Sequence, residues 1–172
     1  MITMVLLLSA ATAAAAPPPA LDGAAQGLGM GLVAGDPSGL SLSYRPPSAD
    51  AYLQGAAGWS VSDETLSFNV DYLYTVAVFD SPDDPALTFP VYVGVGARAR
   101  LGEDRAVEAV GRASSLGLRV PFGIAFTPQT VALDVFIEAV PTLVLLPETT
   151  IKLSGGIGVR VYPFRKVIRI RM

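Results

Sequence analysis

A strict alternation of apolar and polar positions runs through residues 66–78. The residues on its apolar side are Leu66, Phe68, Val70, Tyr72, Tyr74, Val76 and Val78. A period of two with aromatic and β-branched residues is typical of a β-strand, whereas a helix would spread the same residues around its circumference. The segment is longer than the usual strand of about 5–6 residues and could cross a bilayer, which takes about 9–11 residues of a tilted strand.

Seven further segments show the same alternation. Residues typical of turns separate them, as in DPSG at 36–39 and SDET at 62–65. The longest connection, 102–115, is compatible with one or two helical turns. The eight predicted strands are 27–35, 40–45, 51–61, 66–78, 89–101, 116–127, 133–143 and 150–162.

Eight amphipathic strands joined by short turns form a meander, and closure into a barrel is the simplest way to hide its two edges. We therefore predict an all-β fold, an eight-stranded antiparallel up-and-down β-barrel with both ends of the barrel segment at the same rim. Pro121 and Pro141 interrupt the alternation at nearly the same height. Because neither can donate a ladder hydrogen bond, a bulge or a locally splayed pair is expected there.

The apolar face of these strands is too bulky to point inward. The interior of an eight-stranded barrel is only wide enough for side chains, and the polar face, rich in Gly, Ala and Ser, fits it better. An outward apolar belt of this size exceeds what soluble monomers tolerate, so the surroundings are expected to be lipid. This predicts a transmembrane β-barrel. Its predicted lipid-facing aromatic girdle consists of Tyr44, Trp59, Phe68, Tyr74, Phe89, Phe126 and Phe164.

The charged residues of the polar face should then lie in the bore. Unpaired charges in a narrow interior are costly, so we expect hydrogen-bonded ion pairs that fill it. Folding neighbouring strands about their turns places Asp71 close to Arg98, and Asp134 close to Arg160. The predicted lumen ion network consists of Asp71, Arg98, Arg100, Arg119, Asp134, Glu138, Lys152 and Arg160.

The composition excludes several classes of function. The 172 residues suit a single domain, and the net charge of −3 gives no case for nucleic-acid binding. Charged residues make up 16%, below the roughly 25% that is usual for soluble domains. The sequence has no Cys and no His, which removes disulfides, thiolate zinc sites and the commonest general base. We therefore expect no enzyme activity, no metal and no cofactor.

Two patterns imitate functional motifs. The Gly-rich segments 27–31 and 155–158 do not open a helix after a strand, so they are interpreted as lumen glycines and not as phosphate loops. Asp134 and Glu138 share a face of one predicted strand. Their separation of about 13 Å by strand rise is larger than the roughly 5–9.5 Å of paired glycosidase carboxylates, which favours a structural ion network.

The two ends of the chain differ from the barrel segment. Residues 1–16 have an apolar core followed by A-x-A choices and are predicted to be a secretory signal peptide, although they lack Lys and Arg before the core. An apolar tail or a short helix is the alternative. Residues 17–26 are predicted to be a flexible lead-in, and 27–164 the barrel. The basic segment 165–172 either contacts anionic headgroups or is an unstructured extension.

Six motifs in order carry a resemblance to a known family. They are GLGMGLVAGDPSGLS, DYLY, YVGVGAR, LRVPFGI, LDVFIEAVP and GGIGVRVY, and together they span about 27–164. In their order and spacing the chain resembles the small eight-stranded outer-membrane β-barrel proteins of Gram-negative bacteria, in particular an uncharacterised family of the size of outer-membrane proteins A and X. Such barrels usually end in an aromatic residue that the assembly machinery reads. Here the candidate, Phe164, is followed by RKVIRIRM.

The resemblance implies export through a Sec-type signal, an outer-membrane location and a monomeric state. It also implies contact with outer-membrane lipids, with periplasmic chaperones and with the barrel assembly machinery. Three functions remain open: a structural barrel or narrow pore, a binding or adhesion protein that uses its surface loops, and a soluble lipocalin-like carrier with the opposite facing. Short loops near Asp36, Asp63, Glu103 and Glu148 disfavour the second.

Overall fold

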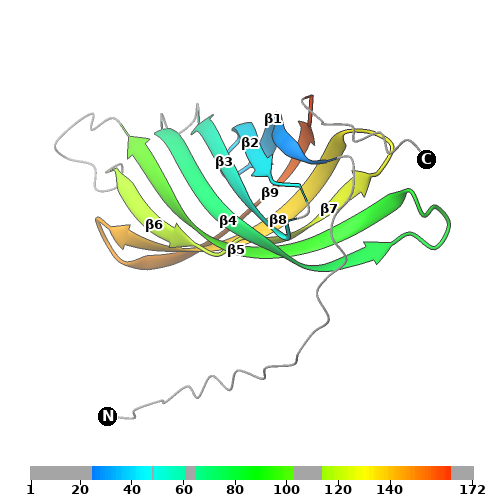
Figure 1. Cartoon of the computed structure of the whole chain (residues 1–172). Helices are drawn as coiled ribbons and strands as arrows, with labels where there is room; N and C mark the ends of the chain where they lie inside the picture. The colour runs from blue at the N-terminus through cyan, green and yellow to red at the C-terminus, as the bar shows by residue number, and fades with distance from the viewer. Residues whose placement is uncertain (1–24, 48, 61–64, 103–113, 164–172) are drawn as a thin grey trace, which may run out of the picture.

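The computed structural model describes residues 25–47, 49–60, 65–102 and 114–163 (Figure 1). Within these ranges every regular element is a β-strand, and no helix that could cross a membrane occurs. The predicted helical turns at 102–115 lie almost entirely outside the described residues. The strands are β1 (Gly27–Gly35), β2 (Gly39–Arg45), β3 (Ala51–Ser60), β4 (Thr65–Asp80), β5 (Leu87–Gly102), β6 (Ser115–Arg119), β7 (Phe122–Pro128), β8 (Leu133–Leu146) and β9 (Thr150–Val161).

The nine strands form one antiparallel sheet that closes on itself. Each strand pairs with its neighbour in sequence order through β5, and β8 pairs with β9. The first and last strands then pair with each other, from Met30 opposite Val161 to Gly35 opposite Gly156. Both β6 and β7 lie between β5 and β8, so they share one place in the ring. The ring therefore has eight places, in the order β1, β2, β3, β4, β5, β6 with β7, β8, β9.

The ring has two rims with different contents. At the terminal rim, where β1 begins and β9 ends, lie the connections 46–50, 81–86 and 129–132. At the distal rim lie the turns 36–38 and 147–149. The expectation that both ends of the barrel segment lie at one rim is confirmed by the pairing of Met30 with Val161.

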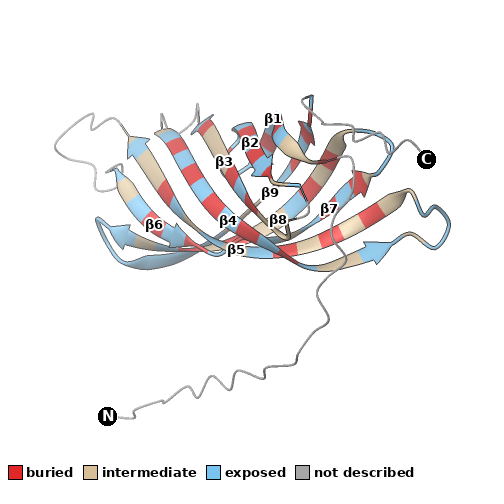
Figure 2. Ribbon diagram, viewed as in Figure 1, coloured by how far each residue is buried: buried red, intermediate tan, exposed pale blue. Residues whose placement is uncertain are grey.

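The two faces of the sheet differ sharply in exposure, and Figure 2 shows this as alternating colours along β4. Val70 is 63% exposed and Tyr72 55%, whereas Asp71 and Leu73, the residues that follow each of them, are 0% exposed. The same alternation runs along β2 and β6. The polar face therefore points into the ring and the apolar face points out of it, as the sizes of the two faces predicted.

The single predicted strand 116–127 is two strands in the structure, interrupted at Val120 and Pro121. Of the expected bulge or locally splayed pair, the bulge is wrong, because the register on both sides continues without a shift: Arg119 lies opposite Thr142, and Phe122 opposite Ala139. The interruption itself lies at the predicted place. The Val120 amide still donates to the Pro141 carbonyl at 3.0 Å, and the Pro121 carbonyl accepts from Gly94 at 2.8 Å. Hydrogen bonds around the two prolines thus carry the ladder across the interruption.

Register shifts occur elsewhere. One lies between Thr75 and Ala77 in the pairing of β4 with β5, the two longest strands, which curve together in Figure 1. Another lies between Leu116 and Gly117 in the pairing of β6 with β8. The first one moves the pairing of the rest of β4 with β5 by one residue.

Candidate functional site

The inside of the ring holds an unusual number of buried polar and charged side chains. Four arginines are at most 8% exposed: Arg45, Arg98, Arg119 and Arg160. Asp71 and Asp134 are fully buried. These six residues come from six different strands, β2, β4, β5, β6, β8 and β9. Because buried charges are costly without partners, the arrangement of these groups determines how stable the interior is.

The Asp134 cluster lies toward the terminal rim. Asp134 and Arg160 are direct neighbours across β8 and β9, and Arg160 Nε donates to Asp134 Oδ1 at 3.0 Å. This pair is where the hairpin of strands seven and eight predicted it. The second carboxylate oxygen accepts from the Tyr162 hydroxyl at 2.6 Å, and Arg160 NH1 donates to Gln54 Oε1 at 2.6 Å. Both Asp134 oxygens therefore accept hydrogen bonds.

A second buried arginine shares the same carboxylate. Arg45 NH2 lies 3.9 Å from Asp134 Oδ2, and the Arg45 guanidinium stacks over the Tyr52 ring at 4.3 Å from its centre. Arg160 lies over the Phe136 ring in the same way, at 4.1 Å. Aromatic faces attract desolvated cations. The two rings therefore stabilise the guanidinium groups of Arg45 and Arg160, which share the single carboxylate of Asp134.

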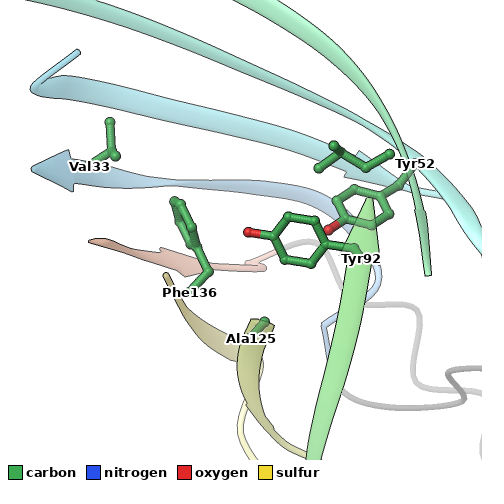
Figure 3. Packing of buried hydrophobic residues seen from close by; sticks show 6 residues of the cluster. Val33, Tyr52, Tyr92, Ala125 and Phe136 are labelled. Carbon is green, nitrogen blue, oxygen red and sulfur yellow. The ribbon is translucent and has the colours of Figure 1, made fainter. Parts of the chain in front are cut away.

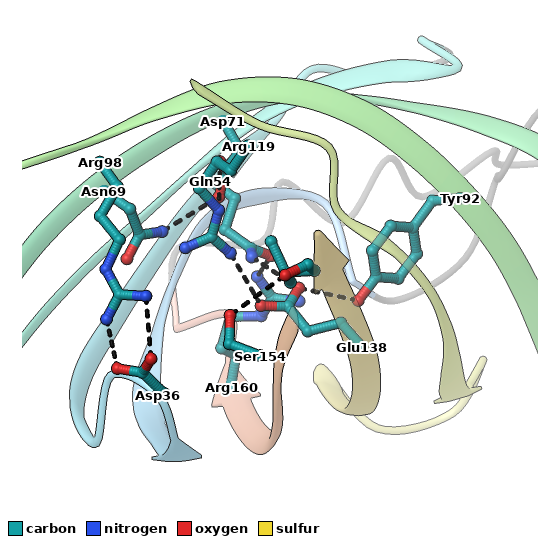
Figure 4. A network of polar contacts seen from close by, with 11 residues as sticks. Asp36, Gln54, Asn69, Asp71, Tyr92, Arg98, Arg119, Glu138, Ser154 and Arg160 are labelled. Carbon is teal, nitrogen blue, oxygen red and sulfur yellow. Dashed lines mark hydrogen bonds and ion pairs between the residues drawn. The ribbon is translucent and has the colours of Figure 1, made fainter. Parts of the chain in front are cut away.

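The Glu138 cluster occupies the middle of the interior (Figure 4). Arg119 lies between two acids, with Nε 3.0 Å from Asp71 Oδ1 and NH2 3.4 Å from Glu138 Oε1. The other Glu138 oxygen accepts from Gln54 at 3.1 Å and from the Tyr92 hydroxyl at 3.4 Å. Gln54 therefore joins the Glu138 cluster to the Asp134 cluster.

The predicted pairing of Asp71 with Arg98 is wrong. Asp71 lies opposite Gly96 and Arg98 lies opposite Asn69, an offset of two residues from the prediction, and the register shift between Thr75 and Ala77 accounts for one of the two. A side chain at Gly96 would collide with the Asp71 carboxyl group, so the glycine makes room for the acid. Asp71 pairs with Arg119 and also accepts from Asn69 Nδ2 at 3.0 Å.

The distal cluster consists of Asp36, Arg98 and Arg100. Asp36 lies in the turn between β1 and β2, and its carboxylate accepts from Arg98 NH1 at 3.1 Å, from Arg98 NH2, and from Arg100 NH2 at 2.8 Å. Partial burial by itself raises the pKa of Asp36, but hydrogen bonds and charge attraction from the two arginines outweigh it and lower that pKa below the ordinary value of 3.8. The acid is therefore ionised at neutral pH.

Lys152, the remaining residue of the predicted network, lies apart from it. Its position on β9 is opposite Thr142, and its side chain is exposed near the distal rim. Among the described residues no ion pair includes Lys152. The other seven members of the predicted network divide among the Asp134, Glu138 and distal clusters.

Sequence reasoning missed several members of these clusters: Asp36, Arg45, Gln54, Asn69, Tyr92 and Tyr162. The signal for Arg45 was present, since it continues the inward positions of Ser41 and Ser43. Asp36 carried no such signal, because it lies in a turn, where strand alternation says nothing about direction.

The interior also holds a cluster of buried apolar side chains. It consists of Val33, Tyr52, Leu73, Tyr92, Ala125 and Phe136, whose labelled members point toward one another in Figure 3. The Tyr52 and Tyr92 rings meet edge to face with centres 6.0 Å apart. The lack of a side chain at Gly158 leaves space for the Phe136 ring, because a Cβ at this position would collide with it. The interior is therefore packed with side chains of both kinds.

The predicted aromatic girdle lies mostly on the outer face. Five of its members are exposed by at least 39%: Tyr44, Trp59, Phe68, Tyr74 and Phe126. Phe89 is half-buried and packs edge to face against Phe126, with ring centres 5.7 Å apart. Phe164 lies outside the described residues. Whether these rings face lipid remains a prediction.

The chemistry available inside the ring is that of fixed charges. Within the described residues no group of three Asp, Glu, His or Cys side chains is close enough to hold a metal ion. The carboxylates are engaged by arginines, and the arginines by carboxylates, amides and rings. Comparisons with protein-family models, with curated proteins and with solved structures found no match, so the resemblance to outer-membrane barrels rests on the sequence motifs alone.

Proposed function

We propose that this chain is a transmembrane β-barrel of an outer membrane whose ion-paired interior keeps the bore closed. In this proposal it acts as a structural barrel or a narrow, plugged pore and has no catalytic site. The observation that supports it most strongly is the inverted polarity of the ring, with charged side chains inside and large apolar side chains outside. Water would favour the opposite arrangement.

The outer apolar surface is continuous around the ring. Each of the nine strands contributes exposed large apolar side chains, from Leu28 on β1 to Val161 on β9. Soluble monomers rarely expose contiguous apolar patches larger than a few hundred Å². In a lipid bilayer the same surface is favourable, because closed strand ladders leave no unpaired backbone edge and apolar side chains meet acyl chains.

Hydrogen bonds that cross the interior support the closed state of the bore. Gln54 on β3 donates to Glu138 on β8, and these strands are four places apart in the ring in either direction. Asp36, which follows β1, bonds to Arg98 on β5, again four places away. Since both contacts join opposite walls, an ion that moves along the bore would have to break or bypass them.

The other functions considered from the sequence have less support. A lipocalin-like carrier needs its apolar face inside, and the described strands have it outside. Adhesion through surface loops needs long loops, whereas the two distal turns that the structure describes in full, at 36–38 and 147–149, are short. Export through residues 1–16, assembly by the barrel machinery and insertion as a monomer are part of the proposal.

Two experiments on the purified full chain test it. In detergent, the unheated protein should migrate faster on a gel than the boiled protein, since a closed strand ring stays folded in the sample buffer. In a planar bilayer, the inserted protein should give no steady conductance, because the clusters fill the bore. Equal mobility of the two samples together with full solubility without detergent would refute the membrane barrel, and a high steady conductance would refute the plug.

A further inference from the structure

The distal cluster carries an uneven set of charges. Two guanidinium groups share a single carboxylate: Asp36 Oδ1 accepts from both Arg98 and Arg100, and Oδ2 accepts from Arg98 alone. Within the part of the chain that the structure describes, Asp36 is the one acid that is ion-paired with these two arginines. Counting these three groups alone, one positive charge is left over.

The arginines also have unused donor capacity. The Arg98 side chain is 9% exposed, and its Nε has no hydrogen-bond partner among the described residues. Arg100 is 28% exposed and bonds to Asp36 through NH2. Guanidinium groups have five N–H donors and match anions with several oxygens, so a single carboxylate does not exhaust this pair.

A polar cavity of about 310 Å³ adjoins the cluster and opens to solvent at the distal rim. The residues that line it include three with hydroxyl groups, Ser38, Thr65 and Ser67, and also Asp36, Arg100 and Trp59. Hydroxyl donors beside guanidinium groups are the usual surroundings of bound phosphate oxygens. The cavity thus gives an anion a route to the arginines that Asp36 occupies.

We propose that Arg98 and Arg100 form a binding site for a phosphate-type dianion, and that the Asp36 carboxylate occupies this site when the dianion is absent. A dianion balances both arginine charges and offers more acceptor oxygens than Asp36 does. Its binding displaces the carboxylate and releases the turn between β1 and β2 from β5 across the ring. The site requires neither a membrane nor a closed bore, so it goes beyond the proposed function.

The turn does not need the Asp36 carboxylate to keep its shape. The Asp36 amide donates to the Gly155 carbonyl at 3.1 Å, and the Trp59 amide donates to the Ser38 carbonyl at 3.2 Å. The Ser38 hydroxyl donates to the Gly35 carbonyl at 2.8 Å. Because these bonds involve the backbone, an Asp36→Asn variant should fold normally and expose the two arginines to outside anions.

The test is a titration of the full chain in detergent with inorganic phosphate, at a pH above the second pKa of phosphate. Calorimetry measures the affinity, because it needs no reporter group near the cavity. We expect Asp36→Asn to bind phosphate at least about tenfold more tightly than the wild type, because the internal competitor is weakened. Arg100→Gln in the Asp36→Asn background should lower that affinity by at least about tenfold.

Lys152→Gln in the same background is the matched control, since it removes one positive charge near the same rim. It should leave the affinity within about twofold, as expected for a charge outside the site. Equal losses of phosphate affinity for Arg100→Gln and Lys152→Gln would overturn the proposal, because phosphate would then be attracted by the general positive charge of the rim and not by a specific site.

A second arm identifies the source of the phosphate group. Mixed detergent micelles that contain phosphatidic acid replace inorganic phosphate, and phosphatidylcholine micelles serve as the blank. Binding heat with phosphatidic acid alone assigns the site to a lipid headgroup, and binding heat with inorganic phosphate assigns it to a free anion. If Asp36→Asn responds to neither probe more strongly than the wild type does, the site does not exist.

Discussion

The Asp134 cluster and the distal cluster use the same chemistry in different surroundings. Each has two arginines around one aspartate, with the carboxylate accepting hydrogen bonds at both oxygens. Asp134, Arg45 and Arg160 are at most 2% exposed, whereas the Asp36 side chain is 47% exposed. Removal of the Asp134 carboxylate leaves two buried arginines without a counter-charge. Removal of the Asp36 carboxylate lets water solvate the arginines instead. Burial, and not the contact itself, therefore decides what each cluster contributes.

The largest effect is expected for Asp134→Asn. It leaves Arg45 and Arg160 buried without a carboxylate, and the loss of one partner of a buried ion pair typically costs about 3–5 kcal/mol. The free energy of unfolding, measured by urea titration in detergent micelles, should fall by this amount. Asp36→Asn is the matched control, with an expected loss below about 1 kcal/mol. Similar losses in the two variants would contradict the comparison.

A double variant sharpens the same point. When Arg45→Met is added to Asp134→Asn, one of the two uncompensated cations is removed, and the methionine can pack against the Tyr52 ring that Arg45 covers. We expect the double variant to be more stable than Asp134→Asn alone, by about 1–3 kcal/mol, because the coupling of neighbouring residues is of this size. If the losses in free energy of unfolding were additive in the double-mutant cycle, the contribution of Arg45 to stability would not depend on Asp134.

An intermediate effect is expected for Asp71→Asn. Asp71 is fully buried, but its partner Arg119 keeps Glu138 at 3.4 Å, so the cation retains a counter-charge. The free energy of unfolding should fall by about 1–3 kcal/mol, the usual range for a compromised buried hydrogen bond. The same urea titration measures it. A loss as large as that of Asp134→Asn would mean that Glu138 does not hold Arg119.

The smallest effect concerns pH. The pKa of Asp36 is lowered below 3.8 in the folded chain, so its contribution to stability is fully present above that value and disappears as the pH falls through the lowered folded pKa. Since the group is half-exposed, the contribution should stay below about 1 kcal/mol. The difference in urea midpoint between wild type and Asp36→Asn should therefore shrink as the pH falls below 3.8. A difference that grows on acidification would contradict the lowered pKa.

The strands and their facing could be predicted because alternation is a local property. Each inward position of 66–76 is fixed by its neighbours two residues away, so one correct assignment orients this part of the strand as far as the register shift. The pairing of Asp134 with Arg160 followed from the short connection between β8 and β9, which sets the register of a hairpin. These features needed no knowledge of distant parts of the chain.

The contacts across the ring could not be predicted in this way. A shift of register between Thr75 and Ala77 moves the residue opposite Asp71 by one, to Gly96, and nothing in the alternation of the sequence announces it. The contact of Asp36 with Arg98 joins opposite walls, and it depends on the curvature and closure of the whole sheet. The break at Val120 and Pro121 was foreseen as a disturbance, but its form depends on the Val120 amide reaching the Pro141 carbonyl.

The central claim, that the outer face of the ring meets lipid, is tested most directly by a cysteine scan of β4. The sequence has no cysteine, so single substitutions at positions 66–74 can each carry one fluorescent label. In lipid vesicles that contain a quencher on their acyl chains, labels at Leu66, Phe68, Val70 and Tyr72 should be quenched, and labels at Ser67, Asn69 and Leu73 should not. Uniform quenching, no quenching at all, or the opposite alternation would contradict a membrane barrel with its charges inside.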